Sequence, residues 1–591
     1  MRSSVRIAAT LLAFTFLAAC HSDRHGTGGD GGNGNGDSGT QSGDGGGDGT
    51  LRCSSDLQNV TDAAGNVVTM CPPAQGCFAG ACIEACSAAS MTKGNVGCDF
   101  VVATPAFFPG IAPPCFAVFL ANNWSSAIHI NVMRGAMSYD ATKFARIATG
   151  ASPDASTWTA VPTTGLPPGQ VAVLFMNSDP SSSNLGNSLA CPVTQAENGV
   201  TAVVGTDVGT AFHITTDAPV SAYDILPYGG ALSYLPAAEL LLPTSAWGTN
   251  YVAVVPPIGD RDGGPRWGQV VAAQDNTTIK VNPTVALTGN GGTMPAAPAG
   301  TATSFTLNAG QFLQWEDSGE ISGSVISSDK PVVFTGGTGY LCLSDATSIG
   351  GGCDSAHQTI PPVAALGSEY VGAPYTTRRA SMQPESIKYR FVGAVDGTVL
   401  NFDPAVAGAP PTLKRGYVAD FETATPFTVS SQDAAHPFYV AQLMTGAQVT
   451  DGSRPGVSPG ADNYLGDEEF VNLLPPAQFL SKYVYFTDPT YGTTNLVLTR
   501  TNTGTGFKDV TVDCIGTVTG WMAVGAAGKY QYAQVDLVRA GVGVGTCHNG
   551  PHSAQSTGAF GLMVWGTDNQ ASYAYPAGGN LGTISSAVVI P

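Results

Sequence analysis

The thirteen cysteines are the residues whose chemistry follows most directly from their type and spacing. A thiol can carry lipid, bind a metal or pair in a disulfide. Cys20 stands alone at the end of an apolar run, and the other twelve form an even number. In an exported chain an even number predicts disulfides, here up to six, rather than metal-binding thiolates. The twelve disulfide candidates are Cys53, Cys71, Cys77, Cys82, Cys86, Cys98, Cys115, Cys191, Cys342, Cys353, Cys514 and Cys547.

The N-terminal segment predicts export and a lipid anchor. Arg2 and Arg6 precede an apolar run that ends in Leu17-Ala18-Ala19-Cys20. This segment resembles the lipobox of bacterial lipoproteins, in which the cysteine is lipidated and becomes the new N-terminus. The resemblance implies a chain anchored by lipid to the bacterial outer membrane, at the cell surface or on the periplasmic face. An ordinary cleaved signal peptide is the alternative.

Two acidic loops could bind calcium. One contains Asp260 and Asp262, and the other contains Asp462, Asp467 and Glu468. Calcium prefers six to eight oxygen ligands, which carboxylates and carbonyls of loops can supply. The spacing matches no EF-hand, and solvated acidic loops have the same pattern. These residues are therefore only weak calcium candidates, and we expect no other cofactor.

The sequence predicts no catalytic residue. It contains no GxSxG, HExxH or Walker motif, and its eight histidines are scattered. Tryptophans near turns could form a platform that stacks on sugar rings, although β-domains more often use tryptophan in their cores. These tryptophans are Trp124, Trp158, Trp267 and Trp315, whereas Trp247 is expected in a core.

Short β-strands must position these residues. Gly (75) and Pro (40) make up about a fifth of the 591 residues, which interrupts helices too often for an α-rich fold. Short apolar runs such as 116–120 and 171–175 lie between turn residues. The fold class is therefore predicted to be all-β and antiparallel.

The chain is predicted to be divided into seven parts. Residues 25–50 are rich in Gly and Asp and have almost no apolar side chain to bury, which is typical of a disordered tether. The parts are a signal peptide (1–19), the lipidated cysteine and tether (20–50), a small Cys-rich module (51–98) and β units at 99–250, 251–370, 371–483 and 484–591.

Three repeated elements define the β units. A polar turn before a Pro-led strand occurs at 215–220 and 327–332, with a degraded copy at 431–438. A hairpin with an Asp-Asn or Asp-Gly turn occurs at 275–281 and again at 396–402. The third element closes each unit with Tyr251, Tyr370 or Tyr483. The unit is thus about 115 residues long with about six strands, β-sandwich-like or alternatively part of a β-propeller.

The unit boundaries suggest a disulfide pairing for half of the cysteines. Cys115 with Cys191, Cys342 with Cys353, and Cys514 with Cys547 each stay within one unit. The six cysteines of the Cys-rich module allow 15 connectivities, among which the sequence does not choose.

The repeated segments resemble a known family. HITTDAPVSAYDILPYGG (213–230), LLPTSAWGTNYVAV (241–254), AAQDNTTIKVNP (272–283) and SSDKPVVFTGG (327–337) are similar to the IgGFc-binding protein N-terminal domain. The resemblance covers about 100–490, and the last unit departs from it. It implies extracellular binding or adhesion rather than catalysis, and it assigns no binding residues.

Charge and resemblance together favour a non-catalytic cell-surface lipoprotein that binds an extracellular protein or glycan. A net charge of −19 excludes the basic patch that a nucleic-acid partner requires. A polysaccharide-degrading hydrolase and a structural envelope component remain alternatives.

Replacing the predicted lipidation site tests the anchor. We expect Cys20→Ser to release the chain from membranes or to block its processing, because serine has no thiol to accept lipid. Membrane fractionation and the mass of the N-terminal peptide measure both effects. A Cys20→Ser chain that is processed and stays membrane-bound would contradict the prediction.

Overall fold

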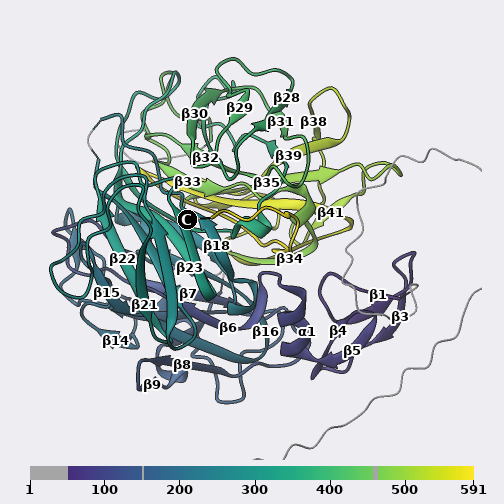
Figure 1. The fold of residues 1–591 in the computed structure, drawn as a ribbon. Helices are drawn as coiled ribbons and strands as arrows, with labels where there is room; N and C mark the ends of the chain where they lie inside the picture. Colours follow the sequence, from purple (N-terminus) through teal and green to yellow (C-terminus); the bar gives the residue numbers. More distant parts are fainter. Residues whose placement is uncertain (1–50, 150–151, 262, 457–463, 591) are drawn as a thin grey trace, which may run out of the picture. The chain divides into compact units, whose positions relative to one another are not determined.

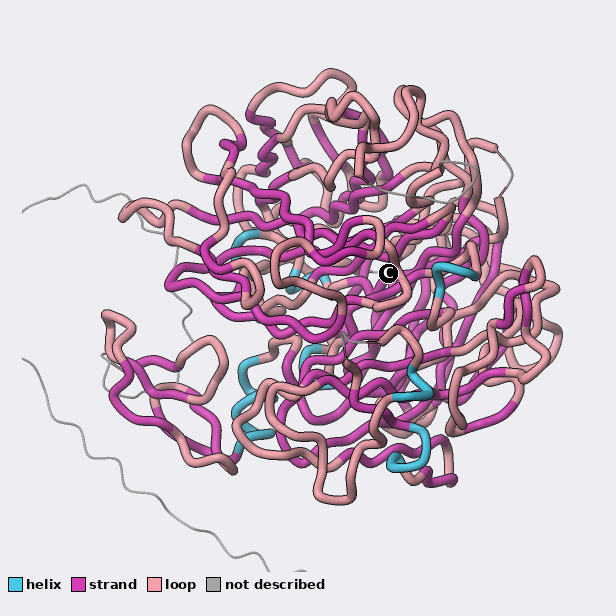
Figure 2. Tube along the Cα trace, turned by 180° about the vertical axis from the view of Figure 1, so that it is seen from behind, coloured by secondary structure: helices cyan, strands magenta, loops and turns pink. Residues whose placement is uncertain are grey.

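The computed structural model describes residues 51–590, except 150–151, 262 and 457–463. These residues form β-sheets that are antiparallel except for one short parallel pair, β11 (Val171–Ser178) with β14 (Glu197–Asn198), together with a few short helices, so the prediction of an all-β chain is confirmed (Figures 1 and 2). Cys20, the predicted signal peptide and the tether lie outside the described residues, as do Asp262 and Asp462. Within the described part, no helix has the length and apolar character needed to cross a membrane.

The Cys-rich module is held by three disulfides. Cys53 pairs with Cys77, Cys71 with Cys82 and Cys86 with Cys98, the connectivity that the sequence left open. A module this small buries too little apolar surface to fold without such links. Its elements are β1 (Arg52–Cys53), β2 (Asn59–Thr61), β3 (Val67–Met70), β4 (Gln75–Phe78), β5 (Ala81–Glu84) and α1 (Ala85–Thr92).

Four successive groups of strands follow the Cys-rich module, and we call them blocks 1 to 4. Block 1 contains β6 (Val96–Val102), β7 (Phe116–Ala121), β8 (Ile130–Arg134), β9 (Met137–Tyr139), α2 (Ala141–Phe144), β10 (Ala145–Ile147), β11 (Val171–Ser178), β14 (Glu197–Asn198), β16 (Phe212–Leu226) and β17 (Ala237–Leu241), with the separate hairpin β12 (Ser183–Asn184) and β13 (Asn187–Ser188). Block 2 contains β15 (Asp207–Thr210), β18 (Gly248–Val252), β19 (Arg266–Ala272), β20 (Thr277–Asn282), β21 (Thr303–Leu307), β22 (Gln311–Asp317), β23 (Val325–Leu341) and β24 (Asp354–Ile360).

The other two blocks complete the described chain. Block 3 is split into smaller sheets of β25 (Glu369–Gly372), β26 (Ile387–Gly393), β27 (Thr398–Val399), β28 (Asn401–Asp403), β29 (Thr412–Leu413), β30 (Val418–Thr423), β31 (Phe427–Ser430), β32 (Phe438–Met444) and β33 (Glu469–Asn472). Block 4 contains β34 (Leu480–Thr487), β35 (Thr493–Thr501), β36 (Val510–Val512), β37 (Gly516–Thr517), β38 (Met522–Val524), β39 (Tyr530–Arg539), β40 (Val542–Gly543), β41 (Gly550–Asp568) and β42 (Ala571–Pro576).

Long strands replace the turns that the sequence suggested before the Pro-led runs. In block 1 the segment around Asp217 is a register shift inside β16, and β23 likewise continues through Asp329. The Oδ1 atom of Asp217 accepts a hydrogen bond from the backbone N–H of His129, and that of Asp329 accepts one from the backbone N–H of Thr278. Each of these strands therefore pairs with different partners along its two halves, which curls the sheet.

The repeated closing element forms the same local structure in each block. A single 3₁₀ turn, η3 (Thr244–Ala246), η4 (Val363–Ala365) or η5 (Pro476–Gln478), is followed by a strand that carries the repeated tyrosine. The hydroxyl of Tyr370 accepts a hydrogen bond from Gly367 N (2.9 Å) and donates one to Phe438 O (2.7 Å). Tyr251 and Tyr483 make the equivalent bonds in their blocks.

A proline from each closing element packs on the preceding block. A Cβ atom added to Gly367 would lie 2.4 Å from the Cβ of Pro475, and the same is true of Gly248 with Pro362. Gly97 and Pro243 repeat this contact between β6 and the first closing element. Only glycine permits so close an approach, so the position requires it.

The contacts among the blocks close into a cycle. The last strand of each block, β17, β24, β33 and β42, contacts its counterpart in the next block, and β42 also contacts β17. The segment after β42 returns to the start of block 1, where Asn95 N donates to Gly579 O (3.0 Å). One buried cluster of apolar side chains accordingly contains Phe119 and Tyr223 of block 1 together with Phe486 and Tyr575 of block 4.

Three more disulfides lie within blocks. The structure pairs Cys115 with Cys191, Cys342 with Cys353 and Cys514 with Cys547, the pairs that the sequence order favoured. The Cys342–Cys353 bond closes the loop between β23 and β24.

Removal of one repeated hydroxyl tests the closing element. Tyr370→Phe leaves a buried N–H and a buried carbonyl without this partner, so we expect it to reduce the free energy of unfolding by about 2 kcal/mol. Urea unfolding measures the change. Tyr417→Phe is the matched control because Tyr417 is 52% exposed. Superimposable curves for the two variants would contradict the role of the hydroxyl.

Candidate functional site

Three titratable side chains meet where β16, β17 and β24 come together. Asp224 on β16 lies directly opposite Glu239 on β17, which places both carboxylates on the same face of the sheet. His357 on β24 lies with its Nε2 atom 3.0 Å from Asp224 Oδ1. One potential ligand atom from each of the three residues lies within 4.8 Å of the other two, and all three residues are buried.

Burial disfavours the charged form of all three groups. It raises the pKa of Asp224 well above its usual value and raises that of Glu239 to about 8, where the charge of Asp224 adds to the effect. It lowers the pKa of His357. Two ionised carboxylates would therefore be costly here without a compensating positive charge.

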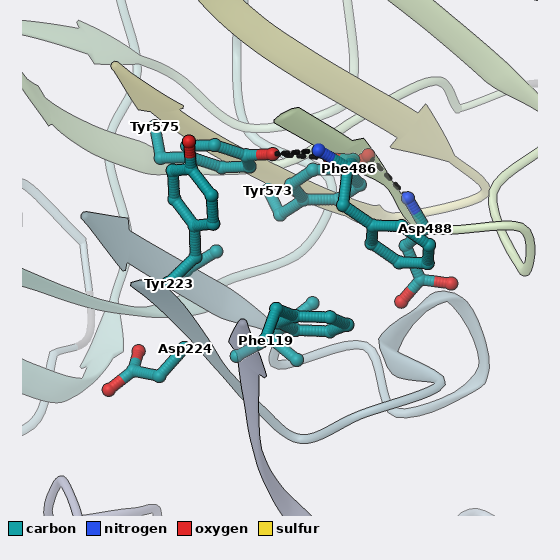
Figure 3. Close-up of a pocket in the computed structure, with 9 residues that line it drawn as sticks. Phe119, Tyr223, Asp224, Phe486, Asp488, Tyr573 and Tyr575 are labelled. Carbon is teal, nitrogen blue, oxygen red and sulfur yellow. Dashed lines mark hydrogen bonds between the residues drawn. The ribbon is translucent and has the colours of Figure 1, made fainter. Parts of the chain in front are cut away.

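A small cavity adjoins Asp224 on the side of block 4. Figure 3 shows Asp224 and Asp488 at opposite ends of its lining, with the aromatic ring of Phe119 between them. Asp488 Oδ1 accepts hydrogen bonds from Thr490 N (2.8 Å) and Thr490 Oγ1 (2.7 Å). Its Oδ2 has no partner among the described residues, and burial raises the pKa of Asp488 to about 6.

A second buried acidic cluster lies at the start of β24 and β33. It consists of Asp354, Asp467, Glu468 and Glu469, and burial raises the pKa of each, that of Asp467 to about 6. Glu468 Oε1 accepts a hydrogen bond from Leu343 N (2.7 Å). Since these carboxyls hold protons more tightly than exposed ones, the cluster is not a simple array of negative charges.

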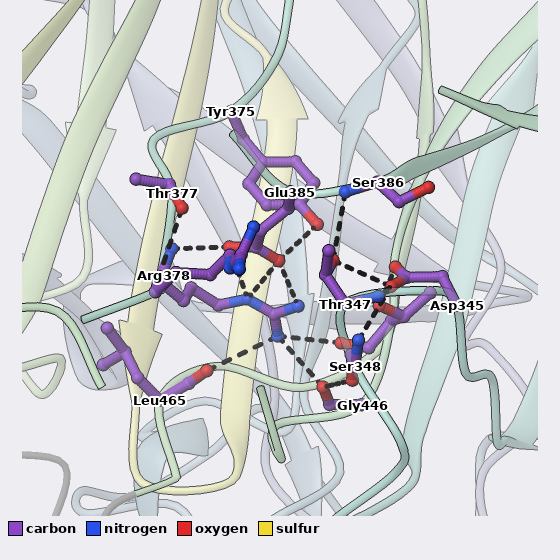
Figure 4. A network of polar contacts seen from close by, with 12 residues as sticks. Asp345, Thr347, Ser348, Tyr375, Thr377, Arg378, Glu385, Ser386, Gly446 and Leu465 are labelled. Carbon is purple, nitrogen blue, oxygen red and sulfur yellow. Dashed lines mark hydrogen bonds and ion pairs between the residues drawn. The ribbon is translucent and has the colours of Figure 1, made fainter. Parts of the chain in front are cut away.

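A buried arginine joins three loops next to this cluster. Figure 4 shows the Arg378 guanidinium between Glu385 and the backbone carbonyls of Gly446 and Leu465. The distance from Nη2 to Glu385 Oε2 is 2.7 Å, and Nη1 also donates to Thr445 O (2.8 Å). Arg378 is fully buried, and the adjacent Glu385 raises its pKa against the opposing effect of burial. An arginine that binds a carboxylate and several carbonyls at once fixes the geometry of all the segments it contacts.

Arg261 connects a fourth loop to the same region. Its Nη2 atom donates to Gly352 O (2.7 Å) and lies 3.2 Å from Glu468 Oε1. We call the joined segments the loop face. They are 256–265, 342–353, 373–386 and 445–468, without the undescribed residues 262 and 457–463.

Three of the weak calcium candidates lie in the described part of this loop face. Asp260 is engaged by Ser344, at 2.9 Å from the backbone N to Oδ2, and by Lys388, at 3.1 Å. Asp467 and Glu468 are buried in the acidic cluster, and Asp262 and Asp462 lie outside the described residues. The fold thus brings the two acidic loops together through Arg261, and calcium binding stays a prediction.

Large apolar side chains project from the loop face. Ile349 in the Cys342–Cys353 loop is 60% exposed, and Met382 in the 373–386 segment is 50% exposed. Both segments are attached to 445–454, through the hydrogen bond from Ile349 N to Gln448 O (3.0 Å) and through the β-bridge of Arg379 with Ser453. Exposed apolar side chains on fixed loops can serve as anchors for a binding partner.

The structure excludes the sugar-stacking platform that the sequence left open as an alternative to core tryptophans. Trp124, Trp158, Trp267 and Trp315 are all buried, so none can stack on a sugar at the surface. The sequence analysis also missed Glu239 and His357. Each is the single titratable residue of a short stretch just before a closing element, Glu239 in AAELLLP and His357 in SAHQTIPP, and this pattern could have identified them.

The disulfides, the fold and the loop face together indicate an exported protein with a fixed loop surface. Six disulfides belong to an oxidising, exported environment, and the repeated sheets support a fixed loop surface. The family model described as IgGFc binding protein matches residues 237–566, more than half of the chain. The chain therefore belongs to this family, and the match extends further into the last unit than the sequence resemblance did.

A curated relative supports the assignment. The IgGFc-binding protein of Homo sapiens is 25% identical over 341 residues, which are 57% of this chain and 6% of the human protein. The chain thus corresponds to a small part of that relative. No solved structure matches the chain.

The cavity carboxyl gives a pH-dependent prediction. Because the pKa of Asp488 is about 6 in the folded chain and 3.8 in the reference state, the folded state retains a proton that the unfolded state loses. Its contribution to stability therefore falls as the pH rises from 4 to 6, by about 2 kcal/mol. We expect Asp488→Asn to flatten the dependence of the unfolding free energy on pH by this amount.

Urea unfolding between pH 4 and 7 measures this difference. Asp509→Asn is a suitable control because its side chain is 83% exposed. If the Asp488→Asn and wild-type profiles run parallel, the burial argument for this carboxyl is wrong.

Proposed function

We propose that this chain is a non-catalytic cell-surface lipoprotein that binds an extracellular protein through the loop face. The observation that carries the proposal is the set of loops joined by Arg378, which hold Ile349 and Met382 exposed. Both residues lie within the segment 237–566 that matches the family. The human relative is named for binding of IgG Fc, which favours a protein ligand over a glycan.

The chemistry of the loop face is suited to a protein surface. Binding energy between proteins concentrates in a few apolar or aromatic anchors with polar groups around them. Ile349 and Met382 supply apolar anchors, and the partly buried ion pair of Arg379 with Asp451 (3.2 Å) supplies polar groups within the loop face. Since the loops are already fixed by buried contacts, little conformational entropy is lost when a partner binds.

The predicted N-terminus would display this surface. A lipidated Cys20 would hold the chain at a membrane, and the Gly- and Asp-rich sequence 25–50 would separate the folded part from the lipid. The same arrangement would suit a structural envelope component, for which the partner would be a neighbouring envelope protein.

Binding measurements test the proposed function. We expect residues 44–591, which form one compact unit, to bind a specific protein saturably. The probes are human IgG Fc, purified extracellular and envelope proteins and a glycan array, each with and without calcium. Calcium dependence would support a role for the acidic loops. Binding to glycans alone, or turnover of a polysaccharide, would replace the proposal by a glycan-binding or hydrolase function.

Two substitutions locate the binding surface. Ile349→Ser combined with Met382→Ser should weaken binding of the identified partner at least about 10-fold, because loss of an apolar anchor costs roughly 1–2 kcal/mol. Val67→Ser and Val542→Ser are matched controls, since both valines are exposed but lie outside the loop face. Equal affinity of the double variant and the controls would place the binding surface elsewhere.

A further inference from the structure

We infer that Asp224, Glu239 and His357 form a zinc site in the interior of the chain, between blocks 1 and 2. Three residues from three adjacent strands converge there, two carboxylates and one imidazole. Protein zinc sites use these ligand types.

The distances suit one small cation. Potential ligand atoms of the three residues all lie within 4.8 Å of one another, and His357 Nε2 is 3.0 Å from Asp224 Oδ1. Ligands around a tetrahedral zinc lie roughly 3.4 Å apart when metal–ligand bonds are about 2.1 Å. Small side-chain movements would thus convert the present arrangement into a coordination sphere.

An unpartnered atom points independently to a ligand. Asp224 Oδ2 is fully buried and has no hydrogen-bond partner among the described residues. A buried carboxylate oxygen without a partner is destabilising, and coordination of a cation would remove this cost.

The strand register creates a charge problem that a divalent cation would solve. Asp224 and Glu239 are directly opposite across β16 and β17, a position where like charges repel. Thr359 donates a hydrogen bond to Glu239 Oε2 (2.8 Å), but within the described part of the chain neither carboxylate forms an ion pair with a lysine or arginine. Two carboxylates with one neutral imidazole carry a charge of −2, which a dication would neutralise.

The ligand set favours zinc over calcium or magnesium. Calcium and magnesium prefer oxygen ligands, usually six or more, whereas zinc accepts imidazole nitrogen in a four-coordinate site. Zinc is also inert to redox change, which fits an oxidising compartment. With three protein ligands, a water molecule would fill the fourth position.

A second convergent group in the described chain serves as a control rather than a site. Asp513, Cys514 and His552 also lie within 4.8 Å of one another. However, the sulfur of Cys514 is bonded to Cys547, so no thiolate is present to bind a metal. Zinc at the proposed site should therefore be independent of His552.

A zinc ion at this site would link block 1 to block 2, where β17 contacts β24. Asp224 and Glu239 belong to block 1, and His357 belongs to block 2. A shared ion would fix β17 against β24, whose other contacts include the hydrogen bond from Gln358 Nε2 to Ala238 O (2.8 Å). The ion would thus act as a structural link whose loss loosens the docking of the two blocks.

Metal analysis of the full chain tests this inference. The chain is unfolded in urea with its disulfides intact and refolded with zinc, calcium or EDTA, because a buried site has to be loaded during folding. We expect about one zinc per chain by mass spectrometry of the metal, no bound calcium, and a higher melting temperature after refolding with zinc. X-ray absorption of the zinc form should show nitrogen and oxygen ligands without sulfur.

Variants identify the ligands. Glu239→Gln and His357→Gln should each weaken zinc binding at least roughly 10–100-fold, and His552→Gln should leave it unchanged. If a ligand variant does not fold, the stoichiometry and absorption spectrum of the wild-type chain still decide the question. The inference is wrong if the wild-type chain, refolded in excess zinc, binds none, or if the bound zinc has sulfur ligands. It is also wrong if both ligand variants fold and bind zinc as tightly as the wild-type chain does.

Discussion

The contact between a closing-element proline and a glycine of the preceding block is the constraint on which the other features depend. Gly97, Gly248 and Gly367 each accept a proline where any side chain would collide. At Gly248 and Gly367 the glycine N–H also donates to the tyrosine hydroxyl of the same element, so the proline contact and the tyrosine hydrogen bonds meet at one residue. The contact occurs at the three junctions between successive blocks, and the last strands of the four blocks, from β17 to β42, contact one another in a cycle.

Closing the cycle removes polar side chains from water. Strands at such a junction carry Glu239, His357 and Glu469, which a single sheet with one solvated face would have exposed. Their altered pKa values arise mainly from burial, which block docking imposes. The interior is therefore partly polar because of how the blocks meet. Each ionisable group there has to be neutral, ion-paired or bound to a ligand.

The sequence predicted the local features well and the long-range ones poorly. Gly and Pro frequency and the repeated short strands indicated the all-β class, because turns and strand periodicity depend on neighbouring residues, and the even cysteine count indicated the disulfides. Asp217 and Asp329 were expected in turns, since nothing local distinguishes a turn from a register shift in a long strand. The burial of Trp267 and the meeting of Glu239 with His357 depend on contacts between blocks, about which a single sequence carries no direct information.

Glu468 connects the interior with the loop face. It immediately precedes β33, which contacts β24 and β42 in the cycle, and its carboxyl group lies 3.2 Å from Arg261, which also holds the Cys342–Cys353 loop through Gly352. Leu343 N donates to the same oxygen, so one carboxylate holds both ends of that loop against the end of β33. The position of Ile349 therefore depends on the contacts of one buried carboxyl group. Loop sequences could vary at their exposed tips without disturbing the sheets, whereas a change at Glu468 would disturb the loop face and β33 together.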